Sequence, residues 1–196
     1  PFLNYLAASW IQFMIHDWFE HGDRDHSDPI AVPVDGNDTH NSGDGTMPIG
    51  RTPADPTKNP SDGRPASFLN ENTAWWDGSQ IYGSNQAKQN ELRTFQDGKM
   101  ILVNGRLPMD AQSGLPITGF NKNWWVGLEM LHTLFVKEHN AIADMLKQSY
   151  PNWTDERLFQ TARLINSAEM AKIHTVDWTP AILKNFTLRE AMFANG

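Results

Sequence analysis

The chain of 196 residues contains no cysteine, so disulfide bonds and thiolate chemistry are excluded and the cellular compartment stays open. It has no apolar run of about eighteen residues, so no stretch predicts a transmembrane helix. Peripheral contact with a membrane remains compatible with the sequence. It also has no basic stripe, and its net charge of -7 argues against a nucleic-acid partner. What remains is 39% hydrophobic, with 8 Trp and 10 Phe, which is enough for a substantial core in one domain or part of one.

The stretch from Phe2 to Glu20 is apolar on nearly every side and predicts a helix that is buried all round. Its polar residues are informative because a buried polar group needs a partner. Gln12 and His16 are four residues apart and share one face, whereas Asp17 must point elsewhere. Two interpretations remain open at this point. His16 is either a buried core histidine beside the capping residue Asp17, or an imidazole with a functional role.

The segment from His21 to Pro65 is rich in Asp, Gly, Pro, Ser and Asn and predicts a long surface excursion with little regular structure. It contains the sequence HGDRDH, for which a solvated acidic loop is favoured over a metal site. Further on, Lys99 to Arg106 predicts a β-hairpin whose turn is Asn104-Gly105.

Helical periodicity dominates the rest of the chain. His132 and His139 share a face of a long helix, where a core or interhelix role is favoured over metal binding, and Thr154 caps the helix that follows. The fold class is therefore mainly α, with long loops and one small β-hairpin. The predicted helices span residues 86–96, 125–148, 155 to about 175, and 183–194.

The stretch NENTAWWDGSQIYGSN presents oxygen atoms at alternating positions. They come from Thr73, Asp77 and Ser79, with the backbone carbonyl of Trp75 between them. A hard cation such as calcium is held by such a loop, although Asp-Gly-Ser is also an ordinary turn. A calcium site would need a further carboxylate, for which Asp17 is the candidate.

Four segments, in order, resemble the animal-type haem peroxidase superfamily and most closely its alpha-dioxygenase branch: WIQFMIHDW, TAWWDGSQIYGSN, LHTLFVKEHNAIADMLK and HTVDWT. The resemblance extends from Phe2 to Asn195. It implies that residues 1–196 are the distal half of a single haem peroxidase-like domain. The proximal histidine and the radical-forming tyrosine would lie beyond Gly196, so this piece alone is expected to be inactive.

The resemblance also implies roles for individual residues. His16 would be the distal histidine that exchanges a proton with hydrogen peroxide, and Gln12 would line the same pocket. Asp17 would join the oxygen loop around a calcium ion that fixes the rotation of the first helix. The residues implied as calcium ligands are Asp17, Thr73, Trp75, Asp77 and Ser79, and those implied as ligands of a fatty-acid carboxylate are His174 and Thr179.

Two departures from the family pattern have chemical consequences. Ile15 stands where related enzymes carry an aspartate esterified to haem, and Trp124 and Trp125 occupy the region of the second ester, so haem b is expected to bind non-covalently. Lys122 stands where the family pattern Gly-Asp-x-Arg places the distal arginine, and it keeps the charge without the planar fork that arginine offers to peroxide.

Three functions are compatible with these features. The first is a fatty-acid dioxygenase that uses a peroxide-activated haem and a tyrosyl radical. The second is a haem peroxidase that oxidises small reducing substrates with hydrogen peroxide, and the third is a non-catalytic binding module on the same fold. The expected partners are therefore hydrogen peroxide or oxygen, together with a fatty acid or a small donor, and the resemblance extends to a role in the response to oxidative stress.

Overall fold

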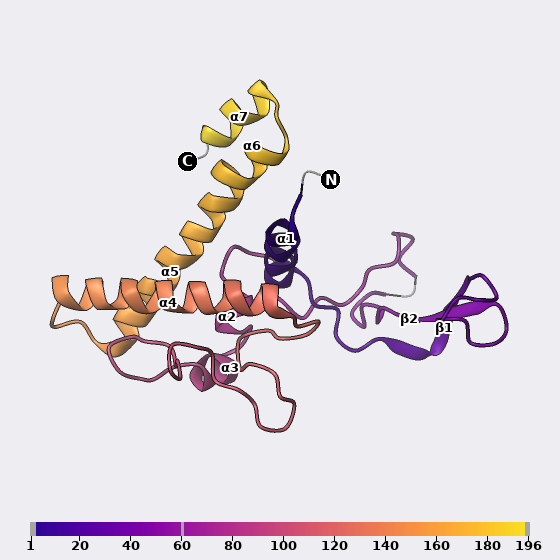
Figure 1. Ribbon diagram of the computed structural model, residues 1–196, viewed down its shortest axis with the longest axis horizontal. Helices are drawn as coiled ribbons and strands as arrows, with labels where there is room; N and C mark the ends of the chain where they lie inside the picture. Colours follow the sequence, from indigo (N-terminus) through magenta and orange to yellow (C-terminus); the bar gives the residue numbers. More distant parts are fainter. Residues whose placement is uncertain (1–2, 60, 195–196) are drawn as a thin grey trace. The chain divides into compact units, whose positions relative to one another are not determined.

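The computed structural model describes residues 3–59 and 61–194 and is mainly helical, as predicted (Figure 1). Among these residues, no helix combines the length and the apolar character needed to cross a bilayer. The helices are α1 (Tyr5–Trp18), α2 (Ser79–Tyr82), α3 (Gln86–Glu91), α4 (Val126–Ser149), α5 (Asp155–Lys172), the π-helix η1 (Ile173–Trp178), α6 (Thr179–Ile182) and α7 (Phe186–Phe193), and the strands are β1 (Asp25–Pro33) and β2 (Thr46–Arg51).

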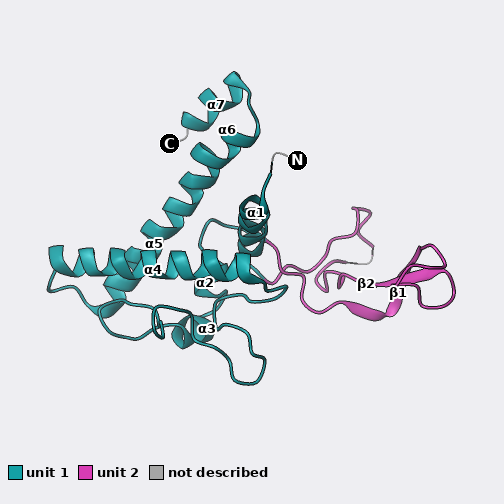
Figure 2. Cartoon of the chain, in the orientation of Figure 1, with its two compact units in different colours: residues 1–18, 72–196 teal, residues 19–71 magenta. Residues whose placement is uncertain are grey.

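The chain forms two compact units, one comprising residues 1–18 and 72–196 and the other residues 19–71 (Figure 2). The smaller unit contains the antiparallel pair β1 and β2, in which Ile30 faces Ile49 and Val32 faces Met47. Here the expectation of little regular structure between residues 21 and 65 is wrong. Alternating branched residues support pairing of the two strands, although β1 is almost entirely exposed.

The predicted hairpin at residues 99–106 forms its turn but no strands. Asn104 and Gly105 adopt positive φ angles of 52° and 75°, and Val103 and Arg106 exchange backbone hydrogen bonds of 2.8 and 3.1 Å. The flanking chain is bonded to the Asn140 side chain on α4, which bonds the N–H and carbonyl of Met100 at 2.8 and 3.0 Å. Met100 also forms an isolated antiparallel bridge with Arg93, and among the described residues the two-stranded hairpin lies in the smaller unit.

The core of the larger unit lies where α1 and α5 pack against α4. Phe13 of α1 stacks on Phe135 of α4 with ring centroids 5.4 Å apart, and Phe159 of α5 is fully buried in the same cluster. Burying a side chain of this size stabilises the fold by about 1.5–3 kcal/mol. The prediction that α1 is buried all round is wrong, because Ile11 and Ile15 are 40% and 42% exposed along one side.

The polar residues predicted for the helical core lie within it. His132 and His139 are both fully buried on α4 and bond to other segments of the unit, in agreement with the interhelix interpretation. Thr154 caps α5 by accepting from the backbone N–H of Arg157 at 3.3 Å. The α5 helix continues directly through η1 into α6, so the predicted break near residue 175 is instead a change to π-helical winding.

Candidate functional site

Gln12 is held at both ends of its side-chain amide. Its Nε2 donates to the carbonyl of Asn123 at 3.1 Å, and its Oε1 accepts from the indole Nε1 of Trp125 at 2.7 Å. The orientation of the amide is therefore fixed, because the indole is a donor and the carbonyl an acceptor. These two bonds tie the middle of α1 to the loop that leads into α4.

His16 lies one helical turn after Gln12 and is 5% exposed. Its ring packs edge-on against Phe120 with centroids 4.6 Å apart, and Asn72 donates to its backbone carbonyl at 2.8 Å. Phe120 lies shortly before Asn123 and Trp125, the two residues that bond to the Gln12 side chain. Lys122, which lies in that loop next to Asn123, is exposed.

Four of the five predicted calcium ligands, all except Trp75, meet on another side of α1. Asp17 Oδ1 accepts from the backbone N–H of Ser79 at 2.8 Å, and the same N–H lies 3.3 Å from Asp77 Oδ1. The Thr73 hydroxyl donates to Asp77 Oδ2 at 2.7 Å. Gly78 permits this approach with a φ of 69°, and a Cβ there would lie 2.9 Å from the Tyr82 ring. We call Asp17, Thr73, Asp77 and Ser79 the oxygen cluster.

Electrostatics in the oxygen cluster is dominated by burial. Asp17 is 1% exposed, and desolvation raises its pKa to about 7, with the neighbouring Asp77 adding to the effect. Hydrogen bonds from Ser79 and the charge of Arg163 oppose the shift. Arg163 of α5 also donates to the Asp77 carbonyl at 3.3 Å, and its guanidinium lies 3.6 Å from the Asp77 carboxylate.

The oxygen cluster offers both carboxylate and hydroxyl oxygens as possible metal ligands. The part of the chain that the structure describes contains no group of three or more His, Cys, Asp or Glu side chains suited to a metal ion. The cluster instead combines two carboxylates with the hydroxyls of Thr73 and Ser79, and the Trp75 carbonyl lies in the same loop. Such a set of oxygens is typical of hard cations, whereas transition metals prefer nitrogen and sulfur.

The predicted carboxylate ligands lie at η1 and at the residue that follows it. His174 is partly buried, and Thr179, five residues later, donates its hydroxyl proton to the His174 carbonyl at 2.7 Å. In this arrangement the Thr179 hydroxyl has no second proton to offer. Segments of π-helix are rare and are frequently found at functional sites, so the winding itself marks this segment.

Sequence reasoning missed the residues that surround these side chains. Trp10, Trp18 and Trp76 contact the ring of His174, and Arg163 contacts Asp77. Trp10 and Trp18 stand in an apolar helix where nothing distinguishes them from core residues, Trp76 stands in the oxygen-rich loop without a sign of its partner, and Arg163 lies 86 residues from Asp77. No local pattern reports contacts of that range.

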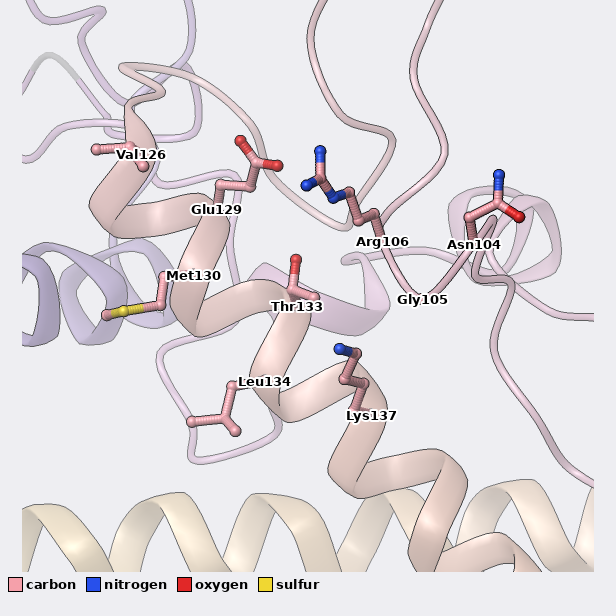
Figure 3. A pocket seen from close by; sticks show the side chains of 9 residues that line it. All are labelled: Asn104, Gly105, Arg106, Val126, Glu129, Met130, Thr133, Leu134 and Lys137. Atoms are coloured by element: carbon pink, nitrogen blue, oxygen red, sulfur yellow. The ribbon is translucent and has the colours of Figure 1, made fainter.

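A hollow of about 860 Å³ lies elsewhere on the larger unit, between the turn at Asn104-Gly105 and α4 (Figure 3). Figure 3 shows Arg106 of the turn facing the side of α4 that carries Glu129 and Lys137. The residues that line it include none of those predicted for haem, cation or substrate, so it is separate from the candidate site.

Comparison with known proteins gives a family match over nearly the whole chain. Residues 1–195 match the family described as animal haem peroxidase. The chain is 42% identical over 195 residues to alpha-dioxygenase PIOX of Oryza sativa subsp. japonica, a match that covers 98% of this chain and 30% of that relative.

Solved structures give the same result. The chain superposes on the crystal structure of a variant of Oryza sativa fatty acid alpha-dioxygenase with palmitic acid, with a TM-score of 0.82 and 41% identity over 98% of this chain and 31% of the other. Peroxidase A from Dictyostelium discoideum gives a TM-score of 0.73 and 27% identity over 89% of this chain and 40% of the other. The chain thus spans about a third of the length of the dioxygenases it matches.

Proposed function

The chain belongs to the animal haem peroxidase family, and on that premise we propose that it forms the distal side of a haem site in a fatty-acid alpha-dioxygenase-like oxidoreductase. One observation carries the proposal: a single stretch of α1 offers Gln12 and His16 along one row and directs Asp17 into the oxygen cluster. The family and the relatives supply the cofactor and the substrate class.

The surface beside His16 is apolar, which supports the proposed binding of a porphyrin there. Ile11 and Ile15 form the neighbouring row of α1 and are exposed, which gives an apolar face next to the imidazole. Ile15 also precedes His16 and has no carboxylate to esterify, so the proposed haem is non-covalently held haem b. When bound, haem supplies the redox chemistry of its iron, and the residues of this chain supply the acid–base chemistry.

The proposed role of His16 is proton transfer. A neutral imidazole takes a proton from one peroxide oxygen and returns it to the leaving oxygen, which is general acid–base catalysis. Gln12, fixed by Asn123 and Trp125, keeps the loop with Lys122 beside the helix with His16. Lys122 provides positive charge near the peroxide without the two parallel hydrogen bonds of an arginine.

Calcium is proposed as the occupant of the oxygen cluster, held by Asp17, Thr73, Asp77, Ser79 and the Trp75 carbonyl. The fit is one of charge and donor type: two carboxylates share one N–H donor, one of them is buried, and a dication balances both. Because Asp17 directly follows His16, a bound ion would fix the rotation of α1 and hence the direction of the imidazole.

His174 and Thr179 are proposed to receive the carboxylate of a fatty acid at η1. Thr179 would transfer its hydroxyl bond from the His174 carbonyl to the ligand, and exchanging one hydrogen bond for another costs little. The proximal histidine and the radical-forming tyrosine are proposed to lie in further segments of the same domain, outside residues 1–196.

Oxygen uptake by the full protein containing this chain tests the proposal. With haem and a trace of peroxide, palmitic acid should drive oxygen consumption, and His16→Gln should lower the rate by about 10²–10⁴-fold, the range of general acid–base catalysis. If uptake is absent while oxidation of guaiacol persists, the protein is a small-donor peroxidase. If no Soret band forms, the binding-module alternative is correct.

A further inference from the structure

The imidazole of His174, which is partly exposed, contacts three indoles from separate places in the larger unit. Trp10 stacks against it with ring centroids 6.3 Å apart and an interplanar angle of 27°. Trp18 meets it edge-on with centroids 5.6 Å apart, and Trp76 lies at 5.4 Å with its ring tilted by 58°. A side chain on η1 thus contacts both α1 and the loop before α2.

One of these contacts is a directional hydrogen bond. The indole Nε1–H of Trp10, a residue that is 8% exposed, lies 3.3 Å from His174 Nδ1. An indole nitrogen is a donor only, so Nδ1 must accept and cannot carry a proton. Burial also lowers the pKa of His174, which favours the neutral ring. In a neutral imidazole without a proton on Nδ1, the proton is on Nε2.

We propose that Trp10 is a positioning residue that fixes His174 as the Nε2–H tautomer, so that the ring presents one N–H donor to the carboxyl group of a fatty acid. The inference rests on the proposed substrate site at η1. It assigns to α1, the helix of His16, a second role, which is to select the tautomer of the substrate ligand.

The assignment changes how the site recognises its ligand. With Nδ1 occupied by Trp10, the neutral ring binds a carboxyl group through a hydrogen bond and not through a full positive charge. Without the indole N–H, either nitrogen could carry the proton, and only part of the molecules would present Nε2–H. The apparent affinity would fall in proportion to that fraction.

The tautomer can be measured directly by long-range ¹H–¹⁵N correlation in ¹⁵N-histidine-labelled protein at neutral pH, with His174→Gln identifying the signals. We expect a protonated Nε2 and an unprotonated Nδ1 in the wild type, and a mixture of tautomers in Trp10→Phe. Trp76→Phe is the matched control, because Trp76 meets the same ring through an aromatic contact that phenylalanine also makes, and it should leave the tautomer unchanged. A protonated Nδ1 in the wild type, or an unchanged tautomer in Trp10→Phe, overturns the inference.

A second measurement needs no variant and so does not depend on how Trp10→Phe folds. In protein labelled with ¹⁵N in Trp and His, a scalar coupling across the hydrogen bond should join Trp10 Nε1 to His174 Nδ1. Its absence in the wild type overturns the inference as well.

Kinetics with palmitic acid completes the test in the full protein. Trp10→Phe should raise KM by the inverse of the fraction of molecules that NMR shows to retain Nε2–H, with little change in kcat, because only the competent tautomer binds. In the His174→Gln background the same change should have no further effect on KM, since no tautomer is left to select. An equal KM effect in both backgrounds would assign Trp10 a merely structural role. Absence of oxygen uptake in the wild type would reject the proposed function, whereas the NMR result would stand independently of it.

Discussion

Asp17 and Ser79, 62 residues apart in the chain, are joined by hydrogen bonds from both the backbone N–H and the hydroxyl of Ser79. The Ser79 N–H donates to the Asp17 carboxylate at 2.8 Å, and the Ser79 hydroxyl donates to the Asp17 carbonyl at 3.1 Å. The last turn of α1 is thereby fastened to the start of α2. The residue before Asp17 is His16, so the same fastening determines where that imidazole lies.

Removing the charge of Asp17 should abolish stabilisation by calcium. In the wild type, calcium at about 100 times its dissociation constant should stabilise the fold by about 2.7 kcal/mol, because the ion binds the folded state only. Asp17→Asn keeps the size of the side chain but removes a ligand charge, so its melting temperature should not rise with calcium. Asp144→Asn, which alters an exposed carboxylate paired with Lys99, should respond like the wild type. An equal calcium response in Asp17→Asn would contradict the cation site.

Chelation should be detected at His174 as well as at the oxygen cluster. Trp18 directly follows Asp17, and Trp76 directly precedes Asp77. Both tryptophans contact the His174 ring. Removing calcium with EDTA should therefore change the tryptophan fluorescence and raise the KM for palmitic acid, and added calcium should restore both. Asp17→Asn, as the control, should show neither response to EDTA. If EDTA leaves the tryptophan fluorescence of the wild type unchanged, the oxygen cluster and His174 are not coupled and the prediction is wrong.

Gln12→Leu should weaken both stability and the reaction with peroxide. It removes the hydrogen bond to the half-buried Trp125 indole, at a cost of about 1 kcal/mol, whereas the exposed Asn123 carbonyl can bond to water instead. The loop that carries Lys122 would be released from α1, so the bimolecular rate with hydrogen peroxide should fall along with the free energy of unfolding. Gln86→Leu on the short helix α3 is a matched control that should leave the peroxide rate unchanged. A normal peroxide rate in Gln12→Leu would remove Gln12 from the proposed site.

Acid should destabilise the fold through His139. Burial lowers the pKa of His139 from 6.5 to about 4, partly opposed by its hydrogen bond to the Gly98 carbonyl. Between these values the unfolded chain binds more protons than the folded one, so the free energy of unfolding falls as pH decreases from 6.5 towards 4. The contribution of this residue is complete above pH 6.5 and should shrink by about 2 kcal/mol between pH 7 and pH 5.

Urea unfolding at pH 7 and pH 5 measures this effect in the wild type and in His139→Gln. The variant loses the bond from Tyr82 and should be less stable at both pH values, but its stability should change less with pH. His26→Gln, which alters an exposed residue of the smaller unit, should keep the full pH dependence. Identical pH dependence in His139→Gln and the wild type would rule out this assignment.

Several features of the fold could be predicted from the sequence because they depend on neighbours in the chain. The spacing of Gln12 and His16 placed them on one helical row, and Asn104-Gly105 formed the tight turn that its conformational preferences indicate. The cap at Thr154 is likewise local. Side chains within about one helical turn of each other have relative positions that the backbone conformation alone specifies.

Other expectations failed where a distant segment competed for the same groups. Around Asn104 only the turn and isolated bridges formed, and the flanking Met100 bonds to Asn140, 40 residues away, and pairs with Arg93. The first helix has an exposed apolar side, which the sequence pattern did not predict. Hydrophobic residues all round a helix do not indicate which of its faces packs against another segment.

The amino-acid sequence by itself determined which side chains could do chemistry: an imidazole one turn after an amide, a carboxylate beside it, and a loop of alternating oxygens. Only the tertiary structure decided which groups meet, bringing Asp17 to Ser79, Arg163 to Asp77 and Trp10 to His174 across 62, 86 and 164 residues. The reason is physical, since contacts between distant residues depend on how helices pack around a shared core, and that packing is a property of the whole chain.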